Sequence, residues 1–236
     1  MTHEADVAAF AAARDRVLET IATAAARAGR ERAGITLVAV SKTVPAERLR
    51  AAVAAGLTLL GENRVQEAEA KAPDVPGATW HLVGPLQSNK ARRALATFTT
   101  IETVDTVELA RRLDGLAAEV RPGARVPVLL QVNVDADPAK AGFAPDALER
   151  SIDELGGLGN LDIRGLMTVG RLVADAEAAR PSFAALRTLS ERLRRPGSPL
   201  GPELSMGMSD DYPVAIEEGA TIVRVGRALF GARDRG

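Results

Sequence analysis

The chain has 236 residues, of which 46% are hydrophobic and 26% are charged, and this is enough apolar material for the core of one large α/β domain. A formal net charge of −1 excludes a global field that would attract nucleic acid or an anionic membrane. The absence of cysteine excludes disulfides and thiolate chemistry, and two histidines are too few for a multi-histidine metal site. For the same reason we expect no metal. Apolar runs are too short to span a membrane, so we expect a cytoplasmic protein.

The first 30 residues are predicted to form one amphipathic helix that packs on the rest of the domain. Val7, Phe10, Val17, Leu18 and Ile21 recur at helical spacing on an alanine-rich background. One face of this helix is therefore expected to be buried.

After this helix, short β-branched runs alternate with stretches rich in alanine, leucine and arginine. The predicted strands lie in the runs ITLVAVS, TLLGE, TWHLVG, TTIETVD, VPVLLQVNV, LDIRGLMTV, PELSMGMS and ATIVRVG. The predicted helices begin near Pro45, Asn63, Ser88, Thr106, Pro145, Asp175 and Asp210, and a short helix closes the series. This alternation predicts an α/β fold, a single (β/α)8 TIM-type barrel domain over residues 1–236, with an open doubly wound sheet as the alternative.

The first predicted strand, LVAVS, runs directly into Lys42. An ammonium group there costs free energy unless it has a partner or loses its proton. The chain contains four lysines against 26 arginines, and we expect Lys71, Lys90 and Lys140 to be solvated because their contexts are polar. A desolvated lysine is what a Schiff base to an aldehyde requires, whereas a structural lysine paired with Glu62 is the alternative.

Small and hydrogen-bonding residues lie at the predicted carboxyl ends of the other strands, where the sites of such barrels gather. Loops after the seventh and eighth strands are the usual phosphate seat in this fold. Backbone N–H groups at Gly207 and Gly226, with the Ser205 hydroxyl, are suited to hold a phosphate without a basic side chain. Together with Lys42 they predict a pocket for a phosphorylated aldehyde.

Six motifs that occur in order, AVSKT, GENRVQE, WHLVGPLQSNK, GLMTV, LSMGMSDD and IVRVGRALFGAR, carry a family resemblance across nearly the whole chain. The sequence resembles the YggS/PROSC family of pyridoxal 5′-phosphate (PLP) homeostasis proteins, whose fold is similar to the barrel domain of alanine racemase. The resemblance implies intracellular PLP homeostasis, with PLP held as a Schiff base on Lys42 and supplied to PLP-dependent apo-enzymes. It also implies the remaining cofactor contacts: Ser205, Gly207, Val225 and Gly226 around the phosphate, Asn63 near the ring, Met208 in the pocket wall, and Arg224 facing the pyridine nitrogen.

An arginine at the pyridine nitrogen bears on catalysis. Arg224 keeps its proton at neutral pH, so it would donate only a hydrogen bond and leave the ring a weak electron sink. Racemisation needs acid/base groups on both faces of the substrate, and in the racemase family the second is a tyrosine from an additional domain. This chain ends at Gly236, and its one tyrosine is Tyr212. We therefore expect a non-catalytic carrier, a monomer or weak dimer, with a weakly active PLP-dependent racemase-like enzyme or a PLP-free lysine aldolase as alternatives.

Several polar residues have simpler structural interpretations. His81 is expected to be a hydrogen-bonded core residue and not a catalyst. Asp210 and Asp211 precede a predicted helix, so we expect them to cap it. The basic residues at 90–93 are expected to form a solvated face that binds no nucleic acid.

Overall fold

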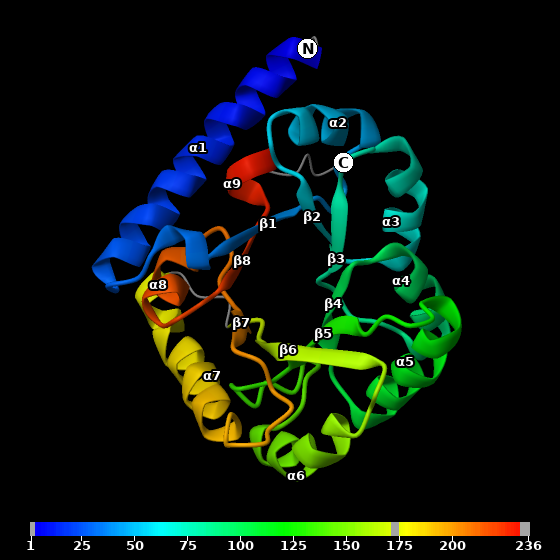
Figure 1. The fold of residues 1–236 in the computed structure, drawn as a ribbon. Coiled ribbons are helices and arrows are strands. Elements are labelled where there is room, and N and C mark those ends of the chain that lie inside the picture. Colours follow the sequence, from blue (N-terminus) through cyan, green and yellow to red (C-terminus); the bar gives the residue numbers. More distant parts are fainter. Residues whose placement is uncertain (1–2, 171–174, 232–236) are drawn as a thin grey trace.

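The computed structural model describes residues 3–170 and 175–231 and shows a closed barrel of eight parallel strands. The strands follow one another around the barrel in their order along the chain (Figure 1). They are β1 (Thr36–Val40), β2 (Leu59–Glu62), β3 (Thr79–Leu82), β4 (Thr100–Val104), β5 (Val126–Gln131), β6 (Leu161–Met167), β7 (Glu203–Ser205) and β8 (Ile222–Val225). Because β8 pairs with β1, the predicted (β/α)8 barrel is confirmed and the open doubly wound sheet is excluded.

Helices surround the barrel, and most begin within a few residues of the predicted positions (Figure 1). They are α1 (His3–Arg27), α2 (Ala46–Ala54), α3 (Val65–Lys71), α4 (Ala91–Thr97), α5 (Val107–Val120), α6 (Pro145–Gly156), α7 (Arg180–Leu193), α8 (Tyr212–Glu217) and α9 (Arg227–Phe230). Short 3-10 turns precede two of them: η3 (Ser88–Lys90) before α4 and η4 (Ala176–Ala179) before α7. A 3-10 turn therefore occupies the position near Ser88 where an α-helix was expected to begin.

Local sequence signals explain where two of these helices begin. The Thr106 hydroxyl accepts a hydrogen bond from the backbone N–H of Leu109 at 3.1 Å, which caps α5. Proline at the first position of α6 needs no N–H partner, and its fixed φ suits a helix start. Both helices then bury apolar residues at helical spacing against the strands.

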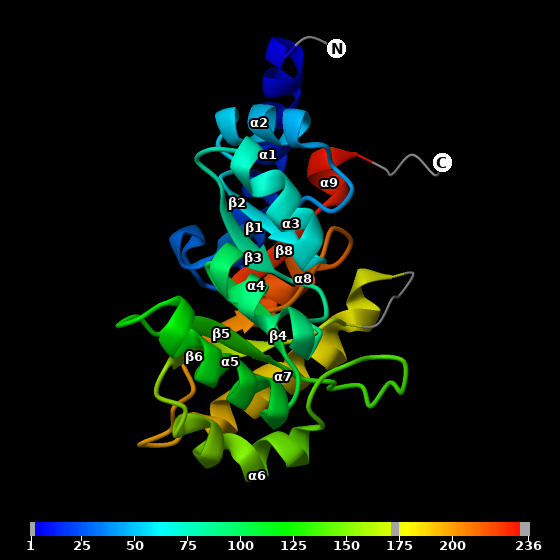
Figure 2. The same cartoon turned by 90° about the vertical axis from the view of Figure 1, so that its right-hand side faces the viewer.

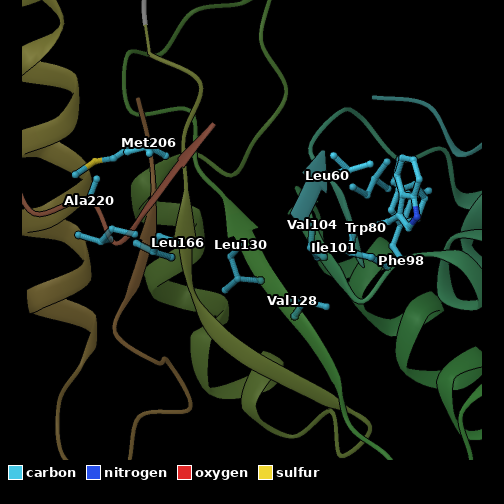
Figure 3. Packing of buried hydrophobic residues seen from close by; sticks show 14 of the residues in the cluster. Leu60, Trp80, Phe98, Ile101, Val104, Val128, Leu130, Leu166, Met206 and Ala220 are labelled. Atoms are coloured by element: carbon cyan, nitrogen blue, oxygen red, sulfur yellow. The ribbon is translucent and has the colours of Figure 1, made fainter. Parts of the chain in front are cut away.

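The apolar side chains of the strands fall into two hydrophobic clusters. The larger cluster lies between the strands and the helices, and Figure 3 shows part of it, from Met206 and Ala220 to Trp80 and Phe98. The smaller cluster contains Val38, Val83, Leu129, Met167 and Ile222. In β1, Ala39 belongs to the larger cluster whereas Val38 belongs to the smaller one, so the smaller cluster fills the barrel interior.

Helix α1 packs along the outside of the barrel, as the N-terminal pattern predicted, and its first turns extend past α2 (Figures 1 and 2). Ile21 is fully buried, and Phe10 is 3% exposed. The Phe10 ring contacts the Phe230 ring edge-on, with centroids 5.6 Å apart, and the Arg48 guanidinium lies 5.2 Å from the Phe10 centroid. These contacts join α1 to α2, the first helix after β1, and to α9, which follows β8.

Candidate functional site

Lys42 and Asn63 lie at the mouth of the barrel, at the carboxyl ends of β1 and β2. Val40 pairs with Gly61, and both side-chain positions face the interior. Because inward positions recur every second residue, Lys42 and Asn63 follow on the same face, side by side. Both are half-buried. The structure thus places the backbone of Lys42 at the mouth.

The loops that follow β7 and β8 lie near the end of β1, which leads into Lys42. The backbone N–H of Arg224 in β8 donates to the Gly207 carbonyl at 3.0 Å, which joins the loop after β7 to β8. A Cβ placed on Gly226 would lie 3.1 Å from the Val40 carbonyl, so this loop also touches β1. The predicted residues Lys42, Gly207 and Gly226 therefore border one mouth, although they are far apart in sequence.

A buried polar network fills the barrel below the mouth. Arg224, 5% exposed, donates from Nη1 to Ser205 Oγ at 2.6 Å and from Nη2 to the Thr168 carbonyl at 2.7 Å. Ser205 Oγ in turn donates to Glu102 Oε2 at 2.5 Å. Glu102 Oε1 lies 2.7 Å from His81 Nδ1. His81 is thus hydrogen-bonded inside the barrel, as predicted.

The charges of this network depend on one another. Burial raises the pKa of Glu102, but His81, Arg224 and Ser205 together outweigh burial and hold that pKa below its usual range. Burial lowers the pKa of Arg224, and Glu102 and Asp211 oppose this shift. Glu102 is therefore the buried counter-charge that keeps a guanidinium inside the barrel.

Glu102 and Thr168 were missed by the sequence analysis. A glutamate inside the β-branched run TTIETVD was a signal for Glu102, because an inward-facing carboxylate needs a partner. Thr168 contributes a backbone carbonyl, which side-chain reasoning does not detect.

Two glycines allow close packing of the backbone at the ends of β7 and β8. Gly207 has φ 91°, and a Cβ there would lie 2.6 Å from the Ala215 Cβ and 2.9 Å from the Tyr212 Cα. At Gly226 the backbone approaches β1 closely. Beside them, the backbone N–H groups of Gly226 and Ala228 both point at Ser209 Oγ, and such a pair of donors suits an anionic phosphate. With an amine and a buried guanidinium beside them, the residues fit a phosphorylated aldehyde cofactor.

Ser209 adds a hydroxyl to this cradle that we did not include among the predicted contacts. Its Oγ accepts from the N–H of Gly226 at 3.2 Å and from the N–H of Ala228 at 3.4 Å. The Ser205 hydroxyl instead bonds to Glu102 and Arg224 within the barrel. Ser209 is the last residue of the predicted strand run PELSMGMS, and this position at the strand end was the available signal.

Asp211 departs from the predicted capping role. It occupies the N-cap position of α8, but its side chain makes no cap hydrogen bond there. Its Oδ1 accepts from the backbone N–H of Met208 at 2.6 Å instead. Burial raises the pKa of Asp211, although that hydrogen bond and Arg224 oppose the shift. Asp210 pairs with Arg227. The prediction that these two aspartates cap α8 is therefore wrong.

The remaining predicted residues have distinct surroundings. Met208 is half-buried in the loop after β7. The Val225 side chain belongs to the outer hydrophobic cluster, so only its backbone is available at the mouth. Gly84 lets the loop after β3 approach Asn63, since a Cβ there would lie 2.4 Å from the Asn63 carbonyl.

Two of the other lysines, Lys71 and Lys140, are less exposed than the sequence predicted. Lys71 was expected to be solvated, but its side chain is only 13% exposed and its Nζ lies 2.7 Å from Glu62 Oε1. Lys140 is also largely covered, at 22% exposed, and donates to the Gly170 carbonyl at 3.1 Å. Glu62, which we considered as a partner of Lys42, thus pairs with Lys71.

A cavity of about 640 Å³ extends the mouth over the loops that follow β2 and β3. Its lining includes Asn63, Arg64, Glu67, Gln87 and Lys90. The cavity therefore gives a polar approach to Asn63.

The described residues contain no group of three or more histidine, cysteine, aspartate or glutamate side chains able to hold a metal ion. No helix in the described part of the chain is long and apolar enough to cross a membrane.

The model of the family "Alanine racemase, N-terminal domain" matches residues 13–234. The pyridoxal phosphate homeostasis protein of Pseudomonas aeruginosa is 45% identical over 227 residues, covering 94% of each chain. The protein of the same name from Escherichia coli K12 is 39% identical over 229 residues, covering 93% of this chain and 94% of its own.

Solved structures agree with these matches. PipY of Synechococcus elongatus is 46% identical and has been solved without PLP (TM-score 0.79, covering 84% of this chain and 94% of PipY). It has also been solved with PLP bound (TM-score 0.77, covering 84% and 93%). An alanine racemase of Clostridium difficile is 18% identical with a TM-score of 0.66, covering 92% of this chain and 56% of the racemase, which shows a shared fold alone.

Proposed function

The chain belongs to the alanine racemase N-terminal domain family and, within it, to the pyridoxal phosphate homeostasis proteins, and from this we propose that it binds pyridoxal 5′-phosphate for intracellular homeostasis. One observation carries the proposal: a lysine, a buried arginine and two glycine-containing loops meet at one barrel mouth, in a chain 46% identical to a protein solved with PLP bound. We treat residues 1–236 as one cofactor-binding unit.

Lys42 and Arg224 are assigned to the two ends of the cofactor ring. Bound PLP supplies an aldehyde that a lysine can capture reversibly as a Schiff base, and a ring that withdraws electrons when its nitrogen is protonated. Lys42 is the amine that we assign to this aldehyde. Arg224 would donate a hydrogen bond at the ring nitrogen and, because a guanidinium keeps its proton at neutral pH, would transfer none to it. Such a site binds the cofactor and limits its reactivity.

The phosphate is assigned to the loops after β7 and β8. The N–H groups of Gly226 and Ala228 already converge on Ser209 Oγ, and Gly207 keeps the neighbouring loop close. We keep Ser205 and Val225 as predicted neighbours and add the Ser209 hydroxyl as a contact. Asn63 and Met208 remain the proposed ring and wall contacts.

We further propose a carrier that supplies PLP to apo-enzymes in the cytoplasm and has no robust turnover. Tyr212 lies in the hydrophobic cluster outside the strands, which does not suit it as a second acid or base over the cofactor. The relatives named above are homeostasis proteins, which also supports a carrier. Racemisation of alanine at enzyme-like rates by the purified protein would contradict this proposal.

Absorbance titration tests the binding proposal. Protein mixed with PLP should develop the visible absorbance of a lysine-bound cofactor, and Lys42→Ala should not. Lys90→Ala is the matched control, because it removes another of the four lysines from the loop after β3. Protein that stays colourless with PLP present would favour the PLP-free aldolase instead. Mixing loaded protein with a PLP-dependent apo-enzyme and measuring the activity gained then tests delivery.

A further inference from the structure

A buried ion pair lies on the outer side of the barrel wall, directly behind Lys42. Glu62 follows the inward-facing Gly61 on β2, so its side chain points toward the helices. The carboxylate is fully buried, and its Oε1 lies 2.7 Å from Lys71 Nζ and accepts from Ser41 Oγ at 2.8 Å. Glu67 Oε2 lies 3.7 Å from the same Nζ. Lys71 thus sits between two carboxylates, of which one has no access to water.

Lys71 also bonds to the backbone that carries Lys42. Its Nζ donates to the Ser41 carbonyl at 3.2 Å, and this carbonyl belongs to the peptide group that links Ser41 to Lys42. The N–H of Val44 donates to the same carbonyl at 3.0 Å. The peptide before Lys42 is therefore held from the outer side while the Lys42 side chain follows the inner face.

The turn after Lys42 has a backbone conformation that needs support. Thr43 has φ 68°, a left-handed conformation uncommon for a residue with a β-branched side chain. Its N–H faces Glu67 Oε2 at 3.5 Å. Lys71 contacts both the Ser41 carbonyl, which precedes Lys42, and Glu67, which faces the N–H of Thr43 after Lys42. One ammonium group therefore links the backbone contacts before and after Lys42.

We propose that Lys71 is a positioning residue for the cofactor amine: through the Ser41 carbonyl and Glu62, it fixes the backbone from which Lys42 reaches the cofactor. This inference rests on the proposed function, because it assigns PLP capture to Lys42. Lys71 takes no part in the chemistry, since it lies behind the wall formed by β1 and β2. In the part of the chain that the structure describes, Glu62 Oε2 has no hydrogen-bond partner and Oε1 pairs with Lys71, so removing Lys71 takes a counter-charge from a buried carboxylate.

The test compares three variants by PLP titration. Lys71→Met should raise the dissociation constant for PLP by about tenfold or more, because Lys42 loses its fixed starting position. The double variant Lys71→Met/Glu62→Met removes the unpaired carboxylate as well, and it should fold like the wild type and still bind PLP weakly. Arg92→Met is the control for loss of a positive charge, because Arg92 forms an exposed pair with Glu119, and it should bind PLP within about twofold of the wild type.

A second readout separates positioning from a merely structural role. The pH at which the visible absorbance of bound PLP is half-developed should shift in both Lys71 variants, since it reports the surroundings of the Lys42 amine. Folded Lys71 variants that keep the wild-type affinity and pH midpoint would overturn the inference, and so would a double variant that recovers both. If the wild type develops no band, or Lys42→Ala keeps it, then the proposed function fails as well, so the two failures are distinguishable.

Discussion

Replacing Glu102 with glutamine tests whether the network inside the barrel depends on charge. The amide has nearly the same shape as the carboxylate and can still accept from Ser205 and bond to His81. The substitution removes the negative charge that is linked to the Arg224 guanidinium through the Ser205 hydroxyl. Both residues are buried, so water cannot replace the lost charge.

The expected loss of stability at pH 7 is about 2–3 kcal/mol. Removing one partner of a buried pair costs about 3–5 kcal/mol, and the hydrogen bonds that the amide keeps reduce this figure. The pKa of folded Glu102 is lowered, so the carboxylate stabilises the protein at pH values above the ordinary glutamate pKa of about 4.3. That contribution is lost as the pH falls through the lowered pKa of the folded state. The difference between wild type and Glu102→Gln should therefore shrink in acid.

Urea unfolding followed by the fluorescence of Trp80, the single tryptophan, measures this difference at pH 7 and again below pH 4. Asp153→Asn is the matched control, because it also removes one negative charge but from an exposed pair with Arg195. The control should leave the unfolding midpoint unchanged. A loss below about 1 kcal/mol at pH 7, or a loss that persists unchanged in acid, would refute the charge argument.

Three further substitutions test other parts of the structure. Gly207→Ala should destabilise the protein by about 1–3 kcal/mol and weaken PLP binding, because φ is 91° and the new Cβ would meet Ala215; calorimetry and titration measure both effects. Asp211→Asn should be at least as stable as the wild type at pH 7 in urea, because the raised pKa means that ionised Asp211 costs stability above its ordinary pKa, and a clear loss would contradict this. Ile21→Ala should cost about 2–5 kcal/mol by thermal unfolding, and a negligible loss would mean that α1 adds little to the barrel.

The barrel could be predicted from the sequence because its signals are repeated. Each buried strand is a short β-branched run, and each is followed by a helical stretch with its own boundary signal, so errors at single boundaries do not change the topology. The 3-10 turn at Ser88 was missed because its hydrogen bonds differ from those of an α-helix by one residue, which side-chain pattern does not encode.

The polar network of the site was only partly predictable. Lys42, Gly207 and Gly226 lie at strand ends, and strand ends share one mouth in a parallel barrel, so position alone brought them together. The pairing of Lys71 with Glu62 depends on how α3 packs against β1 and β2, and the polar sequence around Lys71 gave no sign of its burial. Asp211 bonds backward to Met208 because the loop turns at Gly207, and this turn is a three-dimensional feature.

The barrel wall separates two polar clusters, each built around a buried glutamate. Outside, a fully buried Glu62 binds the lysine that holds the backbone before Lys42; inside, a fully buried Glu102 binds the serine that holds Arg224. The hydrogen bonds within each cluster hold the backbone or side chain that they reach, so each cluster fixes one end of the proposed cofactor site from the side opposite to solvent. A carrier needs this arrangement, because rigid anchors give affinity without placing a proton donor or acceptor over the cofactor. Variants of Glu62 and Glu102 should therefore change cofactor affinity without creating turnover.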